Sequence, residues 1–353
     1  MQALAIKYRP KTFDDVTEQD SIKVILQQQL KSNQIQHCYL FVGGAGTGKT
    51  TTARIFANEI NKGQGNPIEL DAASNNSVDD MRDLIQQAQT KSLNSEYKVF
   101  IIDECHMITV QGWNAILKLI EEPPAKSIFI FCTTDPQKIP KTILSRVQRY
   151  DFRRISQEGI VNRLHDILVS EQKEDFYNSG KASDITYKGE ALKYIAKIAD
   201  GGMRDAITLM DKCLAFSTEL TLENVVKSLG TVNYKLMLDL TDAIIGKRDR
   251  EVIEIIEGVH SQGKDIKQFL KQYTYFLLDI MKYYVGCDWK YITVPKLPEY
   301  EDWFHELREH ELNTCQDLLD TVISLNNTVK YSATAKLDME AQLMIFCKGV
   351  HIE

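Results

Sequence analysis

Short apolar runs alternate with longer amphipathic stretches over the first part of the chain. The runs typical of buried strands are CYLFVG (38–43), PIELDAA (67–73), YKVFIID (97–103) and SIFIFCTT (127–134). The stretches between them with helical periodicity are residues 49–60, 77–89 and 112–122. Near-continuous apolar strands suit a parallel sheet that is covered by helices on both faces. The pattern predicts a doubly wound α/β domain over residues 1–156.

The strand signal almost disappears after this domain. Apolar positions with helical spacing recur over residues 156–172, 189–199 and 203–216, and residues 173–184 form a polar connector. We therefore expect a small helical lid domain over residues 157–231.

Longer amphipathic stretches fill the rest of the chain and predict an all-helical collar domain over residues 232–353. Their apolar faces are wide. Such faces are compatible with a self-contained bundle and equally with helix–helix assembly between chains.

Composition narrows the class of protein. The 353 residues are 43% hydrophobic and 26% charged, with a formal net charge of −7. A surface that bound nucleic acid everywhere would usually be basic, so any contact with DNA is expected through a local patch. The seven cysteines are scattered, which indicates neither a zinc site nor a disulfide framework. The N-terminus has no apolar signal-peptide region, and no run approaches the roughly 18 apolar residues of a membrane span, so we expect a cytoplasmic protein.

The stretch GGAGTGKT (43–50) matches the phosphate-binding loop pattern Gly-x-x-x-x-Gly-Lys-[Ser/Thr] at every defined position. It lies between an expected strand and an expected helix, as its mechanism requires. The glycines let successive N–H groups face phosphate oxygens, and the following helix adds its positive end. Lys49 is expected to reach the β- and γ-phosphates, and Thr50 to offer its hydroxyl to Mg²⁺.

The stretch VFIIDECH (99–106) supplies two further acidic groups. Asp103 ends a buried strand, where a carboxylate is costly unless it meets a cation or donors. Holding the Mg²⁺ shell gives Asp103 that partner, and Glu104 is then placed to orient or deprotonate a water. For His106 we expect a packing or supporting role.

Further candidates follow the fourth strand and the connector of the lid. Thr133 and Thr134 put hydroxyls at the carboxyl edge of the sheet, where ligands of open α/β folds bind. Thr134 is the better candidate for sensing the γ-phosphate or the water, and strand-end capping is the alternative. Arg204 follows Gly201 and Gly202 at a helix start and is read as a second nucleotide sensor, or else as the partner of a nearby aspartate.

Seven stretches together resemble AAA+ ATPases of the clamp-loader clade, and among them most the bacterial DNA polymerase III γ/τ subunits. They are KYRPKTFDDVTEQD, GGAGTGKTTTARIFA, IELDAASNNSVDDMRDL, KVFIIDECHMIT, NAILKLIEEPP, FCTTDPQKIPKTILSR and GGMRDAITLMD. The resemblance covers roughly residues 6–215, and the C-terminal third matches only in kind, as a helical collar. It implies a P-loop AAA+ domain followed by a lid and a collar, and the activity of an ATPase.

The resemblance also implies roles for individual residues. Tyr8, Arg9 and Pro10 would lie against the adenine and its sugar. Asp103 and Glu104 would form the Walker-B pair. The phosphates and Mg²⁺ would be bound by Gly43, Gly44, Ala45, Gly46, Thr47, Gly48, Lys49, Thr50 and Thr51.

Three other residues take roles by the same resemblance. Thr134 would be the first sensor and Arg204 the second. Arg146, in TILSRVQRY (142–150), has no acidic neighbour before Asp151. It falls where the family carries an arginine finger that reaches ATP bound by a neighbouring subunit.

The implied machine is a pentameric ring of clamp-loader subunits that opens a sliding clamp and places it on primer–template DNA. Hydrolysis of ATP would then release the clamp. Two other functions stay open: a non-catalytic stator subunit of the same assembly, and another AAA+ remodelling ATPase of DNA. The intact phosphate loop and Asp-Glu pair argue against a stator.

The sequence departs from the family in three places. The family commonly carries a four-cysteine zinc module after the phosphate-loop helix, whereas the segment before the second strand here has no cysteine, so we predict no zinc. Val147 stands where a cysteine usually follows the finger arginine. The chain also ends soon after the expected collar, as expected of a short form, of a truncated piece, or of a compact variant from a small genome or virus.

The resemblance implies contacts with DNA at helix N-termini that face the inside of the ring. The two starts lie near Ser77 and between Thr109 and Gln111, and Arg82 and Lys91 could add charge. Such contacts would bind the phosphate backbone without reading bases. A solvated helix face is the alternative for Arg82 and Lys91.

Overall fold

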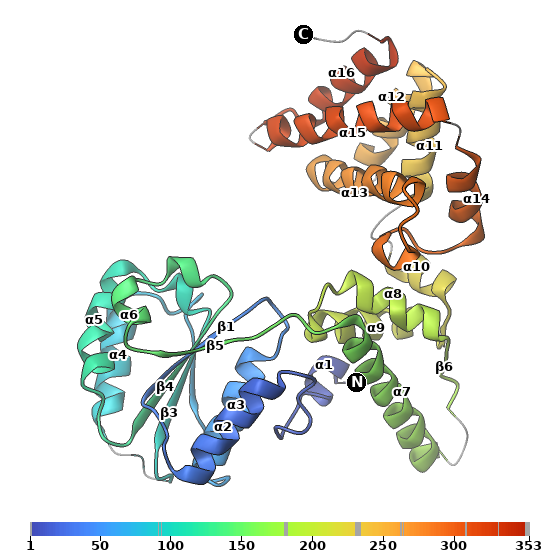
Figure 1. The fold of residues 1–353 in the computed structure, drawn as a ribbon. Coiled ribbons are helices and arrows are strands. Elements are labelled where there is room, and N and C mark those ends of the chain that lie inside the picture. Colours follow the sequence, from blue (N-terminus) through green and yellow to red (C-terminus); the bar gives the residue numbers. More distant parts are fainter. Residues whose placement is uncertain are drawn as a thin grey trace. The chain divides into compact units, whose positions relative to one another are not determined.

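The structure is a computed structural model. It describes residues 2–90, 92, 94–179, 183–229, 234–261, 263, 265–307, 309–330 and 332–349. The chain divides into two compact units, Met1–Leu220 and Thr221–Glu353, which are considered separately (Figure 1). The division into three domains at residues 156 and 231 stays a prediction.

A five-stranded parallel sheet forms the centre of the first unit. Its strands follow the order β2-β3-β4-β1-β5, so the chain crosses over the sheet between neighbours. The bounds are β1 (Cys38–Val42), β2 (Ile68–Asp71), β3 (Lys98–Asp103), β4 (Ser127–Thr133) and β5 (Gln148–Asp151). Because every neighbouring pair is parallel, the carboxyl ends of the strands meet at one edge.

The sheet confirms the predicted α/β class and adds one strand that the sequence pattern did not reveal. Strand β5 has four residues, of which only Tyr150 is buried. It pairs with β1, where Gln148 lies opposite Tyr39. An edge strand that buries one side chain leaves no apolar run to detect, so β5 depends on its pairing with β1.

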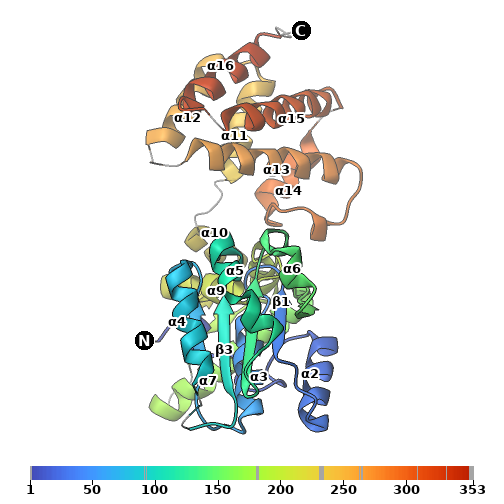
Figure 2. The ribbon, with the colours of Figure 1, turned by 90° about the vertical axis from the view of Figure 1, so that its left-hand side faces the viewer.

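Helices cover both faces of the sheet (Figures 1 and 2). Tyr39 and Phe41 pack with α2 (Asp20–Ser32) and α3 (Lys49–Ile60). Leu40 lies on the opposite face, because successive side chains of a strand alternate. That face is covered by α4 (Val78–Gln89), α5 (Val110–Glu121) and the short α6 (Lys141–Leu144). The remaining short turns of this domain are η1 (Cys105–Met107) and η2 (Pro136–Lys138).

The rest of the first unit is a helical lid. It consists of α7 (Gln157–Ser179), α8 (Gly189–Ile198) and α9 (Met203–Phe216), with a strand pair β6 (Thr186–Tyr187) and β7 (Glu219–Leu220). Helix α7 runs past residue 172 into the segment predicted as a polar connector. Glu174, in that extension, pairs with Lys7 of α1 (Leu4–Lys7), a contact that local sequence does not reveal.

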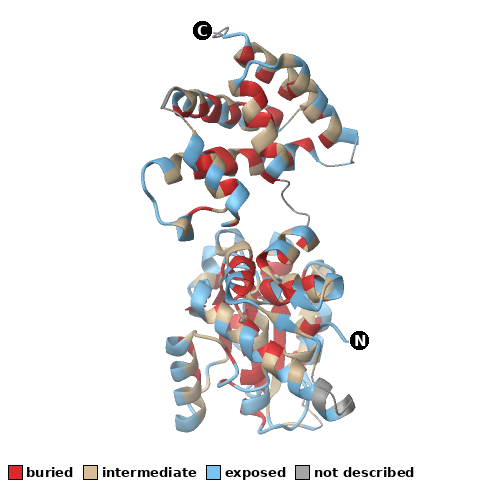
Figure 3. Ribbon diagram, turned by 90° about the vertical axis from the view of Figure 1, so that its right-hand side faces the viewer, coloured by how far each residue is buried: buried red, intermediate tan, exposed pale blue. Residues whose placement is uncertain are grey.

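The second unit is helical throughout its described residues. Its helices are α10 (Leu222–Leu229), α11 (Tyr234–Ile245), α12 (Asp249–Ser261), α13 (Ile266–Tyr284), η3 (Trp289–Tyr291), α14 (Pro298–Glu306), α15 (Glu309–Val329) and α16 (Ala335–Cys347). The elements from α11 to α16 share one apolar core, which includes Leu240, Tyr273 and Leu318. In both units the buried residues lie where elements face one another (Figure 3).

Within the described part of the chain, none of the helices combines the length and the apolar character that crossing a membrane requires.

One buried carboxylate holds a loop to the core of the second unit. Asp279 of α13 is fully buried. Its Oδ2 accepts hydrogen bonds from the N–H groups of Thr293 (2.6 Å) and Val294 (3.1 Å), and its Oδ1 accepts one from Lys282 Nζ (2.9 Å). A charge in this position is tolerated because three donors satisfy it.

Substitution of Asp279 tests this arrangement. Asp279→Ala removes the acceptor that these three donors share, so the free energy of unfolding should fall by about 3 kcal/mol. Asp279→Asn keeps an acceptor oxygen for the backbone and should cost about half as much. Urea denaturation of the full chain, followed by far-ultraviolet circular dichroism, measures both values.

The matched control is Glu299→Gln, at an exposed position of α14 whose side chain makes no ion pair within the described part of the chain. Its effect should stay within about 0.5 kcal/mol. If Asp279→Ala cost no more than this control, the carboxylate would not be holding the loop.

Candidate nucleotide-binding site

The phosphate loop between β1 and α3 lies in direct contact with the lid. Gly46 has φ +70°, and a Cβ at this position would stand 3.0 Å from the Cα of Gly202. The N–H of Met203 donates a hydrogen bond to the carbonyl of Gly46 (3.0 Å). Only glycine allows both the left-handed backbone and this approach. The start of α9 is thereby joined to the loop.

Lys49 is buried at the first turn of α3. Its Nζ donates to the carbonyls of Gly43 (2.9 Å) and Gly44 (2.8 Å), and burial lowers the pKa of the ammonium group. Thr47 also closes the loop, because its hydroxyl donates to the Gly44 carbonyl (2.9 Å). A buried ammonium with only neutral acceptors favours an anion beside it.

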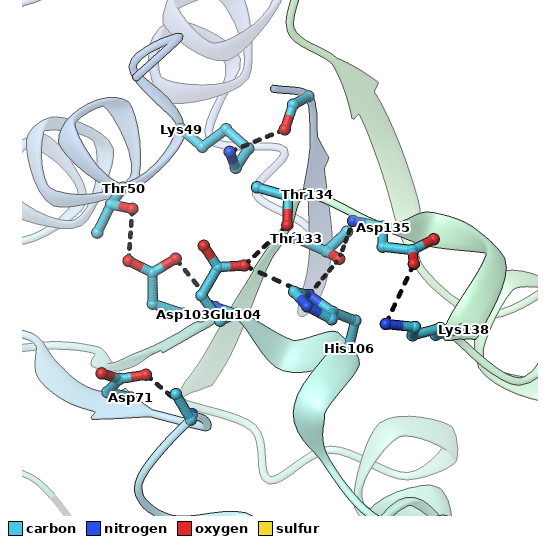
Figure 4. Close-up of polar contacts among 12 residues, drawn as sticks. Lys49, Thr50, Asp71, Asp103, Glu104, His106, Thr133, Thr134, Asp135 and Lys138 are labelled. Atoms are coloured by element: carbon cyan, nitrogen blue, oxygen red, sulfur yellow. Dashed lines mark hydrogen bonds and ion pairs between the residues drawn. The ribbon is translucent and has the colours of Figure 1, made fainter. Parts of the chain in front are cut away.

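Thr50 and Asp103 meet across the gap between α3 and β3 (Figure 4). Thr50 Oγ1 donates to Asp103 Oδ2 (2.7 Å), while Asp103 Oδ1 accepts from the N–H of Glu104 (3.0 Å). A hydroxyl and a carboxylate are the protein ligands that Mg²⁺ takes when phosphates complete its shell. These two residues therefore fit the expected metal site.

Among the described residues, no group of three or more His, Cys, Asp or Glu side chains is arranged to hold a metal ion. Thr50 and Asp103 alone do not make a complete shell. A Mg²⁺ ion here would depend on the phosphates of a nucleotide for its remaining ligands. The expected lack of zinc stays a prediction.

Glu104 is held at the edge of the sheet by its neighbours. Thr134 Oγ1 donates to Glu104 Oε2 (3.1 Å), and His106 Nδ1 lies 3.3 Å from the same oxygen. His106 Nδ1 is also 3.2 Å from Thr133 Oγ1. The backbone of Glu104 is left-handed (φ +47°), a conformation that is costly for a residue with a side chain. Figure 4 shows the carboxylate between Asp103, Thr134 and His106.

Thr133 and Thr134 therefore make different contacts. Thr133 is buried, and its hydroxyl accepts the N–H of Asp135 (3.0 Å), as a strand-end cap does. Thr134 is exposed and contacts Glu104. Strand-end capping, the alternative to a sensing role, is seen for Thr133. No sequence signal indicated that His106 would contact both Thr133 and Glu104.

A pocket of about 260 Å³ opens beside the phosphate loop. The predicted site residues that line it are Tyr8, Arg9, Pro10, Ala45, Gly46, Thr47, Gly48, Lys49, Thr50, Thr51, Asp103, Glu104 and Arg204. Gly43 and Gly44 lie behind Lys49 and accept its hydrogen bonds. Segments as far apart as residues 8 and 204 thus meet in one pocket.

Cations gather around this pocket. Burial lowers the pKa of Arg9, and the guanidinium groups of Arg54 and Arg204 lower it further. Arg204 makes no ion pair in the part of the chain that the structure describes, while Asp200 pairs with Arg154. Arg163 of α7 also lines the pocket, and no sequence motif marked it. The positive charge suits a polyanionic ligand.

Arg146 lies outside the pocket of its own chain. It is half-exposed, and its guanidinium pairs with Glu121 at the end of α5 (2.8 Å). It also donates to the Thr142 carbonyl (2.6 Å) and to Ser145 Oγ (2.9 Å). The acidic partner, absent from the neighbouring sequence, comes from packing of α5 against α6. Arg149 pairs with Asp151.

The residues proposed to contact DNA lie at the starts of two helices, which differ in the charge of their first turns. Ser77 caps α4 in a reciprocal pair with Asp80, and two aspartates occupy the first turn. Thr109 caps α5, whose first turn has no acidic residue and includes the exposed Gln111. Negative charge weakens phosphate binding at a helix start, so the α5 start suits phosphate better.

Of the two cations proposed to contact DNA, the structure describes Arg82 but not Lys91. Arg82 is exposed and pairs with Asp79 one turn earlier (2.8 Å), which fits a solvated helix face. Lys91 lies outside the described residues.

Two family models match the chain. One is described as DNA polymerase III, delta subunit, and matches residues 68–156. The other is described as DNA polymerase III clamp loader subunit, ATPase lid domain, and matches residues 181–219. Together they match part of the sheet domain and the lid.

Curated relatives match more of the sequence. The chain is 33% identical to DNA polymerase III subunit tau of Bacillus subtilis, over 99% of this chain and 64% of that protein. It is 34% identical to DNA polymerase III subunit tau of Escherichia coli, over 74% of this chain and 42% of that protein. The chain therefore spans less than two thirds of the length of these relatives.

A solved structure supports the fold alone. The RuvB Holliday junction branch migration motor of Thermotoga maritima has a TM-score of 0.51, 18% sequence identity, and coverage of 73% of this chain and 86% of that chain. This likeness agrees with the predicted AAA+ architecture. Since similarity to the polymerase III subunits extends over nearly the whole sequence at 33% identity, the chain belongs to the bacterial DNA polymerase III γ/τ family of AAA+ clamp-loader subunits.

Proposed function

We propose that this chain is a motor ATPase subunit of a DNA sliding-clamp loader. ATP binding opens the clamp and places it on primer–template DNA, and hydrolysis releases it. The observation that carries the proposal is the convergence of Lys49, the Asp103–Glu104 pair and Arg204 on one pocket. A stator has no need of this set, whereas a motor requires all of it.

The phosphates of ATP bind at the N-terminus of α3. N–H groups of the loop and the ammonium of Lys49 surround the β- and γ-phosphates. Thr50 and Asp103 would hold Mg²⁺, which would supply positive charge beside the transferred phosphoryl group. The buried Lys49 is already placed within the loop, so little reorganisation is needed.

Glu104 acts on the attacking water. Its carboxylate lines the pocket and is oriented by Thr134 Oγ1 at 3.1 Å. A carboxylate in this position orients the water and accepts its proton as the water oxygen bonds to the γ-phosphorus. The bond from that phosphorus to the bridging oxygen breaks in the same step, and ADP is the leaving group. Thr134 thereby couples the presence of the γ-phosphate to the position of the Glu104 carboxylate.

The lid senses the bound nucleotide through Arg204. The Gly46–Met203 hydrogen bond keeps the start of α9 on the phosphate loop, and Arg204 then contributes its charge to bound phosphates. Movement of the lid with the nucleotide gives each subunit two conformations, which a ring can use to open a clamp.

Arg146 completes the site of a neighbouring subunit in a pentameric ring. It lies outside its own pocket and is half-exposed, so its guanidinium is available to a partner. Its bond with Glu121 at 2.8 Å keeps it ordered until the neighbour docks. Hydrolysis is then tied to assembly, because the finger withdraws when subunits separate.

The main test is ATP hydrolysis by the complete assembly. With its partner subunits, the protein should hydrolyse ATP faster when both sliding clamp and primed DNA are present. Lys49→Ala should abolish the stimulated rate, because the phosphates lose their buried cation. A steady-state phosphate-release assay measures the rates, and equal rates with and without clamp and DNA would contradict the motor role.

Glu104→Gln separates binding from chemistry. The amide keeps the shape and accepts no proton, so ATP should bind with unchanged affinity while hydrolysis falls by about 100-fold or more. Binding is measured by calorimetry and turnover by phosphate release. The matched control is Glu122→Gln, at an exposed position after α5, and wild-type turnover in Glu104→Gln would exclude the base role.

Arg146→Ala tests action between subunits. The isolated variant should bind ATP as the wild type does, because Arg146 lies outside its own pocket. In the assembly, hydrolysis should fall by about 1,000-fold at the site that receives the finger. Mixing with a wild-type neighbour that supplies the arginine should restore it.

The control for this variant is Arg149→Ala, three residues away and paired with Asp151. It should leave the hydrolysis rate of the assembly near the wild-type value. Loss of ATP binding by the isolated Arg146→Ala chain would instead place this arginine in its own site.

A further inference from the structure

Arg163 is a cation of the pocket to which neither the sequence motifs nor the proposed mechanism assigns a role. It lies on α7, is half-buried and lines the same pocket as Lys49 and Arg204. Its Nη2 donates to the backbone carbonyl of Tyr8 (3.1 Å). In the described part of the chain it forms no ion pair, and no other hydrogen bond of its guanidinium is seen.

The carboxylate of Asp15 makes no ion pair with Arg163 in the described part of the chain. The pKa of Asp15 is lowered by the hydrogen bonds from Thr12 and Lys11, and the guanidinium of Arg163 lowers it by a smaller amount. Its Oδ2 is instead taken up by the N–H groups of Lys11 and Thr12 and by the Thr12 hydroxyl, at 2.9 to 3.2 Å. A guanidinium has five N–H donors, so most of the Arg163 donors remain for a ligand.

The position of Arg163 points to one half of the nucleotide. Lys49, Thr50 and Asp103 mark the phosphate end of the pocket. Arg163 instead contacts Tyr8, in the N-terminal segment that lines the pocket together with apolar residues. Those apolar residues are Ala5, Val16, Ile155, Met203 and Ile207. A nucleotide with its phosphates on α3 must extend its neutral half toward such a surface.

We infer that Arg163 is a nucleotide-binding residue that contacts the adenosine half of ATP. The inference rests on the proposed nucleotide site and assigns a residue within it. A planar guanidinium stacks on a base or donates to ring nitrogens and ribose hydroxyls, and all of these contacts are available on adenosine. The lid helix α7 thereby touches the ligand directly.

A purely structural role for Arg163 predicts a different behaviour. The N-terminal segment is also tied to the lid by Lys7, whose Nζ lies 2.6 Å from both Glu171 and Glu174 of α7. Lys7 does not line the pocket. If Arg163 served only as a tether through Tyr8, breaking the tether at Lys7 should have the same effect on ligand binding.

The test compares two ligands and two variants of the full chain. Calorimetry measures the dissociation constants of Mg–ATP and of Mg–tripolyphosphate, which lacks adenosine. Arg163→Gln should weaken ATP binding by about tenfold or more and leave tripolyphosphate binding within about twofold, because a lost charge-assisted hydrogen bond acts only on the adenosine half. Lys7→Met should change ATP binding by less than about threefold.

Two further measurements sharpen the result. Arg163→Lys should recover only part of the affinity, because an ammonium lacks the planar fork. Binding of 2′-deoxy-ATP and 3′-deoxy-ATP distinguishes a contact with the ribose from a contact with the base. If Arg163→Gln weakens binding of one analogue less than it weakens binding of ATP, Arg163 contacts the hydroxyl that this analogue lacks. If the variant weakens binding of both analogues as much as binding of ATP, Arg163 contacts the base. Equal thermal midpoints of the variants show that folding is intact.

The outcomes separate the inference from the proposed function. Wild-type ATP affinity in Arg163→Gln, equal weakening of both ligands, or an equal loss in Lys7→Met would each overturn the inference. Any of these leaves the nucleotide site standing. Failure of the wild-type chain to bind Mg–ATP would instead contradict the proposed function itself.

Discussion

The contact between Gly46 and the start of α9 is the constraint on which the rest of the first unit depends. Two backbones approach to a distance at which a Cβ on Gly46 would stand 3.0 Å from Gly202. The N–H of Met203, otherwise a free donor at the end of a helix, is satisfied by the Gly46 carbonyl. Lid and phosphate loop thereby share one small junction, and Arg204 follows it directly.

The sheet order explains how the acidic pair meets its partners. Strands β1 and β3 both flank β4, so the loop after β1, the Asp103–Glu104 pair after β3 and Thr134 after β4 end side by side. Because all these strands are parallel, their polar ends occur at the same edge. The hydrogen bonds of Figure 4 are a consequence of this topology.

The N-terminal segment connects the pocket to the lid. Lys7 pairs with α7, and the N–H of Leu4 donates to Asp211 of α9 (3.1 Å). Residues that follow directly, Tyr8 to Pro10, line the pocket. A ligand in contact with this segment is therefore in contact with a part of the chain that is fastened to the lid. Under the proposed function, this arrangement gives the lid a second connection to the nucleotide besides Arg204.

Local sequence was sufficient for the central strands, for the phosphate loop and for the Asp103–Glu104 pair. Their signals are apolar runs and fixed spacings within a few residues, which depend on no distant partner. Helix α2, strand β5 and the extension of α7 were missed. Each has a weak or mixed pattern and is stabilised by packing against segments elsewhere in the chain.

Tertiary structure alone decided which side chains share a site. Arg163 and Tyr8 are 155 positions apart and joined by a hydrogen bond, and Glu121 reaches Arg146 only because α5 packs beside α6. For neither arginine does the local sequence pattern predict which residue it contacts. The sequence by itself determined which residues have the chemistry for the proposed binding of phosphate and activation of water. The folded chain determined which cations face the pocket and which face outward, because distance in space is set by the sheet order and the packing of helices.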